Sequence, residues 1–451
     1  MATGVLFSEE IEDETSEAVK ANRKKSVSLL EERKKNHGDD ANYFIAPGVI
    51  ANKQEKTVML DAFTTSVAPG DIAEFFIIGE HSGNSYEALF FAFALPSDIC
   101  RAIEFIGLSK GRSVDYKNLI FWSKGERVNG VAIKENTSDK IPLESFVYDA
   151  KTKSLLQQTG FVFTADGWKD NAFIGDEVGP ISIISSYNES LSVLDTSGKA
   201  MQSDVYERYV VSTNFTRGRD VWYTIVLTPE KRPKGKPLRV VDYKLSFKKS
   251  DVEGSTSNVV CSGSYKTQQS QEKEDFKNES LSTAINNMRK FLPEQDVFAS
   301  VDWSEDLTIR EIKTVCTMLK MIDADNAIRI EPPVSGHLYY KAFLPNDDWR
   351  DRTKRFSQPC ALRFHKKDDG SYGANLEIIE EIWGDSSLDP ELKISVSENI
   401  TPEALPKLLK THTPNLNVLL IFAPRDMLYK NVVPYTKSIF DTHKNIHVFE
   451  E

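Results

Sequence analysis

The stretch YEALFFAFALPSDICRAIEFIG, residues 86–107, contains the two local patterns that decide the fold. Its first nine residues are almost entirely apolar or aromatic, which is typical of a buried strand. Pro96-Ser97-Asp98 then supplies helix-start signals, and Ile99, Ile103 and Ile106 follow at helical spacing before Gly107. The stretch therefore predicts a buried strand followed directly by a helix packed on its sheet.

Strand-like patterns extend from this stretch over residues 42–267. The runs are rich in β-branched and aromatic residues and are bounded by Gly, Pro, Asn and Asp. We expect strands at 57–63, 74–78, 86–94, 145–148, 160–164, 181–184, 221–227 and 240–247. The predicted fold class is α+β, with a β-rich N-terminal domain that carries one main helix, followed by one or two small α/β (β-α-β) units.

Changes in composition divide the chain into segments. Length alone suggests about three domains at roughly 150 residues each. Acidic residues precede basic ones over residues 8–36, and sparse apolar positions indicate a solvated helix. Polar residues 268–278 precede an amphipathic run, after which helices alternate with single strands. We expect a charged helical arm at 1–40, a β-rich domain at 41–267, a linker helix at 268–295 and an α/β region at 296–451.

The last region has the pattern of a degenerate internal repeat. In residues 296–346 and 391–451, a strand, a threonine, an amphipathic helix and a second strand precede a Leu-Tyr pair and a lysine. Each copy is a β-α-β unit of about 50 residues, which is too short to close a core without its neighbour.

Composition and charge exclude several classes of protein. The 56 basic and 67 acidic side chains give a net charge of −11, which argues against a nucleic-acid binder. The longest apolar run, 89–95, is far shorter than the ~20 residues of a membrane helix. We therefore expect no nucleic-acid partner and no membrane-spanning segment.

The sequence contains few groups that suggest chemistry. We find no phosphate-binding loop, dinucleotide fingerprint, zinc-protease motif or nucleophile elbow. The four cysteines are widely spaced, and Cys100 and Cys316 lie among apolar residues as buried thiols would. His443 and His447 have the spacing of a helical metal pair, but residues 445–449 have the pattern of a strand. We predict no metal and no cofactor.

The turn before the quoted stretch is the first candidate site. Gly83 and Asn84 precede Tyr86 and Glu87, so these polar side chains either form an ordinary hairpin end or reach a cleft at the strand entrance. In a cleft, Glu87 is a candidate general base, with Tyr86 and Asp166 as further candidates. This alternative is a hydrolase.

A basic cluster is the second candidate. Residues 349–355 contain Arg350, Arg352 and Arg355, whose guanidinium groups can bind a carboxylate or phosphate. His337 and Lys341 precede them among aromatic residues. The alternative is a solvated face whose charges pair with acidic neighbours.

Two segments resemble known families. Residues 45–230, through Tyr86-Glu87-Ala88-Leu89, the Pro96-Ser97-Asp98-Ile99 helix start and Gly160-Phe161-Val162-Phe163-Thr164, resemble the YdjY-like domain. Tyr86 stands where that family has histidine, and Ala165-Asp166 replaces a Gly-Ser pair. Residues 394–433 are similar in apolar pattern to the periplasmic domain of ExbD/TolR proteins, without their membrane helix. The first resemblance implies an α+β fold and a bacterial, exported protein.

Taken together, these patterns favour a binding or interaction protein with no catalytic constellation. Its expected partner is another protein or a component of the cell envelope. The N-terminus has no signal-peptide core, so we expect a periplasmic or extracellular location if a signal peptide was removed and a cytoplasmic one otherwise.

Overall fold

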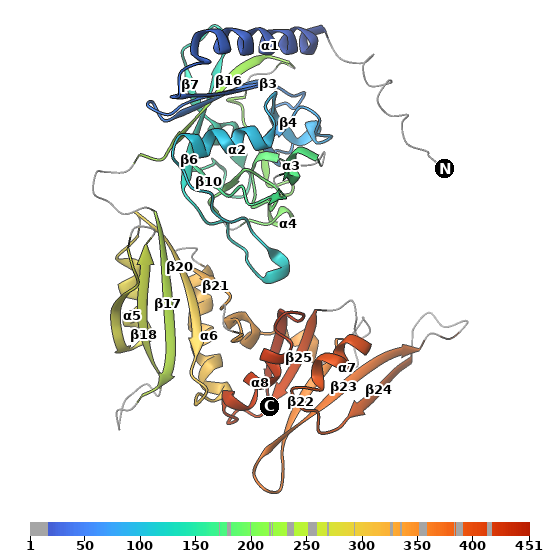
Figure 1. Ribbon diagram of the computed structural model, residues 1–451. Coiled ribbons are helices and arrows are strands. Elements are labelled where there is room, and N and C mark those ends of the chain that lie inside the picture. Colours follow the sequence, from blue (N-terminus) through green and yellow to red (C-terminus); the bar gives the residue numbers. More distant parts are fainter. Residues whose placement is uncertain are drawn as a thin grey trace. The chain divides into compact units, whose positions relative to one another are not determined.

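The structure is a computed structural model that combines many strands with fewer helices (Figure 1). It describes residues 17–170, 172–177, 182–198, 200–215, 218, 220–231, 239–250, 259–267, 270–292, 294–324, 328–333, 336–350, 359–382, 384, 391–412 and 417–451. The chain forms two compact units, one of residues 1–114 and 121–236, the other of residues 115–120 and 237–451. The expectation of a mixed, strand-rich fold is confirmed.

An eight-stranded closed barrel forms the first unit, where the sequence predicted a sheet with one helix on it. The barrel closes because β3 pairs with both β16 and β5, joining the two ends of the strand order. Its strands, in spatial order, are β3 (Thr57–Thr64), β16 (Trp222–Pro229), β6 (Arg127–Lys134), β10 (Phe161–Phe163), β14 (Leu194–Thr196), β13 (Ser182–Ser185), β4 (Phe75–Gly79) and β5 (Ala88–Ala92).

Most of the barrel strands pair antiparallel, but β4–β5 and β13–β14 are parallel. The barrel interior holds aromatic side chains in edge-to-face contact, such as Phe90 against Phe146 and Tyr223. All three rings are fully buried. Leu89, Phe90, Ala92 and Ala94 of the apolar run belong to this buried core, whereas Phe91 and Phe93 are half-buried.

The helix predicted after this strand is confirmed as α2 (Pro96–Phe105). Ile99 and Ile103 are fully buried, and Ile106 caps the helix before Gly107, whose φ of 101° suits glycine. This helix contacts β1 (Tyr43–Ala46), β2 (Val49–Asn52) and β3 on the outside of the barrel.

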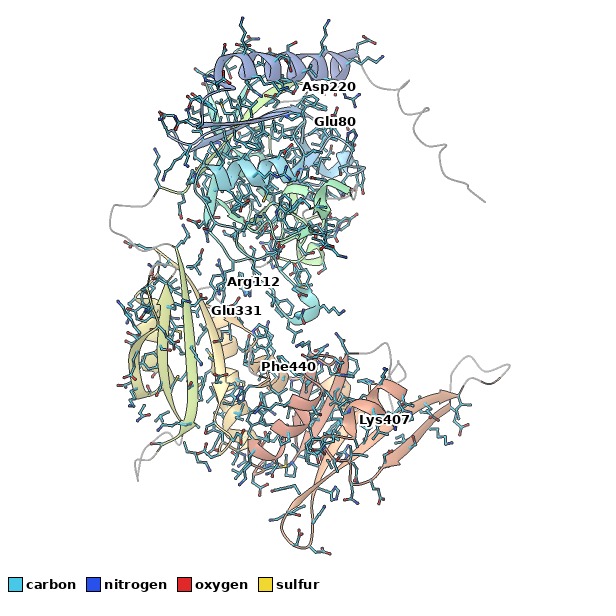
Figure 2. The ribbon with its side chains drawn as sticks, in the orientation of Figure 1. Glu80, Arg112, Asp220, Glu331, Lys407 and Phe440 are labelled. Carbon is cyan, nitrogen blue, oxygen red and sulfur yellow. The ribbon has the colours of Figure 1, made fainter. Side chains whose placement is uncertain are left out.

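The helix α1 (Glu17–His37) lies against the barrel, whereas the sequence indicated a solvated arm. Arg33 donates to both carboxylate oxygens of Asp61, at 2.6 and 2.9 Å, and Ser26 donates to the same group. Asp61 is fully buried, so this contact attaches the helix to β3. Figure 2 shows Glu80 and Asp220 beside the helix, where they accept bonds from Arg23 and Asn22. The sequence missed this because the buried partners are polar.

Short elements complete the first unit. They are β7 (Lys140–Pro142), which pairs with β6, the sheet β15-β8-β9 (Tyr209–Val211, Val147–Asp149, Ser154–Leu155), the hairpin β11-β12 (Trp168–Lys169, Ala172–Phe173), and helices α3 (Ile174–Glu177) and α4 (Gln202–Val205).

The second unit begins with a five-stranded sheet, which we call sheet F. Its order is β19 (Lys273–Glu279), β18 (Val259–Thr267), β17 (Val240–Lys249), β20 (Asp296–Trp303) and β21 (Ile328–Glu331). The helices α5 (Leu281–Arg289) and α6 (Ile309–Ala324) connect β19 to β20 and β20 to β21. The hairpin β17-β18 is antiparallel, whereas β17, β20 and β21 run parallel.

A second five-stranded sheet, sheet H, has the same order and directions. It contains β24 (Glu391–Ser397), β23 (Tyr372–Ile382), β22 (Ala361–Lys366), β25 (Val418–Ala423) and β26 (Asn445–Glu450), with helices α7 (Leu405–His412) and α8 (Val433–Ser438). The second unit therefore contains one β-β-β-α-β-α-β arrangement twice. Equivalent loops join the copies, since Tyr429 donates to the Leu307 carbonyl and Ile309 donates to that of Met427.

These copies differ from the expected repeat. The sequence-based repeat aligned residues 296–346 with 391–451, which would make β20 the equivalent of β24. In the topology, the equivalent of β20 is β25, and the equivalent of β19 is β24. The expected boundary after residue 267 differs as well, because β17 and β18 belong to sheet F. In the sequence, the strand pattern of β17 and β18 continues that of the barrel strands. Only their pairing within sheet F shows that they belong to the second unit.

Candidate functional site

Tyr86 and Glu87 lie at the entrance to β5, in a 3-10 turn (Ser85–Glu87). Tyr86 is 68 % exposed, whereas Glu87 is 8 % exposed. The neighbouring strand β4 begins one residue after Glu74, and its parallel pairing with β5 places Glu74 beside Glu87. The Glu74 backbone N–H donates to the Glu87 carbonyl at 2.9 Å.

These two carboxyl groups share a poorly hydrated environment. Burial raises the pKa of Glu87, and the nearby charge of Glu74 raises it further. Burial also raises the pKa of Glu74, although Gln202 donates to its Oε2 at 2.9 Å. The Glu74 Oε1 has no hydrogen-bond partner among the described residues. Burial therefore favours the protonated form of both carboxyl groups.

Asp166 has a structural contact elsewhere in the barrel. Its Oδ2 accepts a hydrogen bond from the Ser113 backbone at 3.0 Å, which fixes the loop after β10. The preceding residue, Ala165, has a φ of 40°, a backbone conformation that few side chains adopt. Asp166 therefore holds two loops together, and the hydrolase alternative, with a cleft near Tyr86 and Glu87, stays a prediction.

The basic candidates are dispersed. Arg350 pairs with Asp347 at 3.6 Å and lies over the Phe449 ring, 5.3 Å from its centroid. His337 packs against Tyr429, and burial lowers its pKa. Lys341 lies over Tyr339 and Tyr340. Arg352 and Arg355 lie outside the described residues. Each described member thus contacts a different aromatic group, and these contacts assemble no guanidinium fork.

The histidine pair and the cysteines give no metal site among the described residues. His447 lies on β26, as the strand pattern indicated, and stacks on Trp349. All four cysteines are buried, which confirms the prediction for Cys100 and Cys316. Burial raises the pKa of Cys100 to about 11 and that of Cys261 to about 12, so these thiols are poor nucleophiles.

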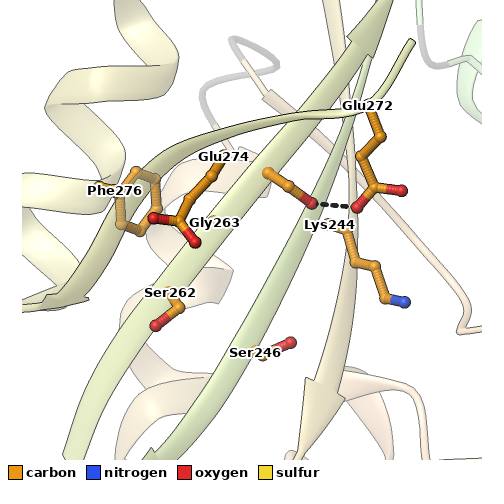
Figure 3. Close-up of a pocket in the computed structure, with 8 residues that line it drawn as sticks. Lys244, Ser246, Ser262, Gly263, Glu272, Glu274 and Phe276 are labelled. Atoms are coloured by element: carbon orange, nitrogen blue, oxygen red, sulfur yellow. Dashed lines mark hydrogen bonds between the residues drawn. The ribbon is translucent and has the colours of Figure 1, made fainter.

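A hollow lies on sheet F, where the sequence predicted a strand at 240–247 and a linker helix at 268–295, but where β18 and β19 also form strands. Its volume is about 450 Å³, within the range of small-ligand pockets. We call it the sheet F hollow, and Figure 3 shows its lining, which consists of Lys244, Ser246, Ser262, Gly263, Ser264, Glu272, Glu274 and Phe276.

Strand alternation creates this hollow. Tyr243, Leu245 and Phe247 on β17 are buried, whereas Lys244 and Ser246 between them are exposed. The register then places Ser264 opposite Lys244 and Ser262 opposite Ser246. The polar residues therefore gather on one face of the sheet because side chains alternate along every strand. The alternation is visible in the sequence, but the pairing that gathers it is not.

The charges in the sheet F hollow are unequal. Lys244 lies 4.0 Å from Asp302 on β20, which offsets its positive charge. Glu272 accepts a hydrogen bond from Ser264, a neutral donor (Figure 3). Neither Glu272 nor Glu274 has a cationic partner in the portion of the chain that the structure describes. The hollow therefore presents two uncompensated carboxylates beside the Ser246 and Ser262 hydroxyls.

Comparisons with known proteins add no assignment, because no family model, curated protein or solved structure matches this chain. The resemblances to the YdjY-like and ExbD/TolR families stay predictions. None of the described helices combines the length and apolar character that a bilayer crossing needs.

Proposed function

We propose that this chain is a non-catalytic binding protein whose sheet F hollow takes a cationic group, such as a lysine or arginine side chain of a partner protein. The observation that carries the proposal is the pair of uncompensated carboxylates, Glu272 and Glu274, in a concave surface. An ammonium or guanidinium group placed there would gain charge-assisted hydrogen bonds. Hydroxyl groups of Ser246 and Ser262 supply further acceptors and donors.

The exposure of Glu272 and Glu274 favours binding of a charged partner over catalysis. Glu274 is an exposed residue of the edge strand β19, and Glu272 is exposed directly before that strand begins. Attraction at such a surface steers a charged partner and is screened by salt. We therefore expect modest affinity that falls as ionic strength rises.

Titration with a short oligolysine peptide tests this proposal, with an oligoglutamate peptide as the ligand control. We expect a saturable heat of binding for oligolysine only. The affinity for oligolysine should be weaker at high salt. The variant E272Q/E274Q should lose about tenfold or more in affinity, because a charged hydrogen bond contributes ~1.5–3 kcal/mol. The variant E279Q changes charge on the same strand outside the hollow, so its affinity should stay near that of the wild type.

Two results would contradict the proposal. One is a wild-type protein that binds neither peptide in low salt. The other is an E272Q/E274Q variant that retains its affinity while its melting temperature matches the wild type, since the carboxylates would then be uninvolved.

A further inference from the structure

The duplicated arrangement of the second unit gives an internal comparison between two edge strands. β19 ends sheet F and β24 ends sheet H, and both follow the same antiparallel hairpin. An open edge strand presents unpaired backbone groups, and proteins commonly protect it with charged side chains. The two strands occupy equivalent positions, so a difference between them is not dictated by the fold.

Their side chains differ sharply. β19 has the sequence KEDFKNE, in which Phe276 is the single apolar residue and is 7 % exposed. β24 has the sequence ELKISVS, in which Ile394 is 51 % exposed and Val396 is 53 % exposed. The edge of sheet F is thus protected by charge, whereas that of sheet H exposes β-branched apolar groups that suit strand pairing.

The exposed groups of β24 share one face of sheet H. Leu392, Ile394 and Val396 alternate with Lys393 and Ser395, so the apolar three point to the same side. On β23, Ile379 lies directly opposite Ile394 and is half-buried. Phe364 on β22 points to the other face, where it contacts Tyr435 of α8. The apolar strip therefore lies on the face away from that helix.

We propose that β24 pairs antiparallel with β24 of a second copy of this chain. The pattern of the strand is symmetric about Ile394, and this symmetry selects a second copy as the occupant. With Ile394 opposite its own equivalent, Leu392 lies opposite Val396 of the other copy, and all three apolar pairs occupy one face. On the other face Lys393 lies opposite Ser395, and Glu391 opposite Ser397, so no like charges are directly opposed.

This pairing is isologous, as a two-fold dimer requires, and it joins the two copies of sheet H into one continuous sheet. A single strand pair buries less surface than a standard interface. We therefore expect a weak dimer whose population rises with protein concentration. The inference is independent of the sheet F hollow, which involves other strands.

Sedimentation of the full-length protein over a range of concentrations tests the dimer, combined with a charge swap at Ile394. The variants I394K and I394E should each be monomeric at concentrations where the wild type dimerises, because each would oppose two like charges across the axis. An equimolar mixture should restore dimers, since lysine would then face glutamate. M321K is the matched control: Met321 is 70 % exposed on α6, and its replacement should leave the dimer unchanged.

The outcomes separate the alternatives. Restoration of dimers in the mixture supports the register centred on Ile394. A wild type that stays monomeric at every concentration overturns the inference. It does so even if β24 is found to bind a different extended peptide. Dimers that persist in both I394K and I394E also overturn it, because they would form through another surface. Melting temperatures near the wild-type value confirm that the variants fold.

Discussion

At the scale of single residues, buried carboxylates take opposite roles that depend on their partners. Asp149 accepts two hydrogen bonds from Arg208, at 2.6 and 3.0 Å, and two from backbone N–H groups. These bonds lower the pKa of Asp149 to about 2, and the hydrogen bonding from Arg208 has the largest effect. Asp98 is less well paired, and burial raises its pKa despite Arg101. Composition predicts neither direction, because both residues are aspartates near an arginine.

This contrast predicts opposite pH dependence for two variants. The pKa of Asp149 is below its ordinary value of 3.8, so its stabilising contribution is complete above that value and is lost as pH falls toward about 2. The stability difference between wild type and D149N should therefore shrink in acid. For D98N the difference should change with the opposite sign, because the raised pKa of Asp98 favours its protonated form in the fold. Urea unfolding from neutral to acidic pH measures both, and equal slopes would contradict the assignment.

At the scale of elements, one glycine makes room for an aromatic ring of the neighbouring strand in sheet F. Gly263 on β18 lies opposite Phe276 of β19, and a Cβ at this glycine would lie 2.3 Å from the Phe276 ring. Phe276 also stacks near Tyr243, with ring centroids 6.3 Å apart. The edge strand is thus attached by an aromatic ring seated over a glycine. Such a position is easily missed in sequence, where glycine inside a strand pattern only suggests irregularity.

Replacing this glycine should destabilise sheet F. We expect G263A to cost about 1–3 kcal/mol, because overpacking forces side chains from their preferred rotamers. The cost should be smaller in an F276L background, where the shorter side chain can move aside. G79A is the control, since a Cβ at Gly79 would meet nothing within 4 Å. Denaturant unfolding of the wild type, G263A, F276L and G263A/F276L measures the coupling. Equal costs of G263A in both backgrounds would show that the Phe276 ring is not the obstacle.

At the scale of the whole molecule, the chain divides into two units with separate interiors. The barrel interior contains Phe90, Phe146 and Tyr223, whereas the interiors of sheets F and H are filled by residues such as Leu245 and Leu420. Compact units with their own cores commonly unfold as separate cooperative transitions.

Calorimetry should accordingly show two transitions. D149N at neutral pH, where the contribution of Asp149 is complete, should shift the transition of the barrel unit, and G263A should shift that of the second unit. Each variant should leave the other transition in place. A single transition that both variants shift equally would instead show that the units unfold as one.

The sequence by itself determined the features that depend on neighbours along the chain. Helix α2 follows from its start signals and isoleucine spacing, and the buried thiols of Cys100 and Cys316 follow from their apolar surroundings. Several strands were not predicted, among them β18, β22 and β23, and also β6, whose pattern is interrupted by Gly130 and charged termini. Local periodicity is set by backbone geometry, so it can be found without knowing what packs against it.

Only the tertiary structure decided which strands pair. Closure of the barrel depends on β3 meeting β5, with Ala62 opposite Ala92, and no local pattern encodes that partner. The sheet F hollow likewise appears only when β17, β18 and β19 align their polar faces, and the exposure of Ile394 only when β24 becomes an edge. Strand pairing is a long-range choice made by the packing of the whole unit, which is why the candidate surfaces could not be predicted from sequence.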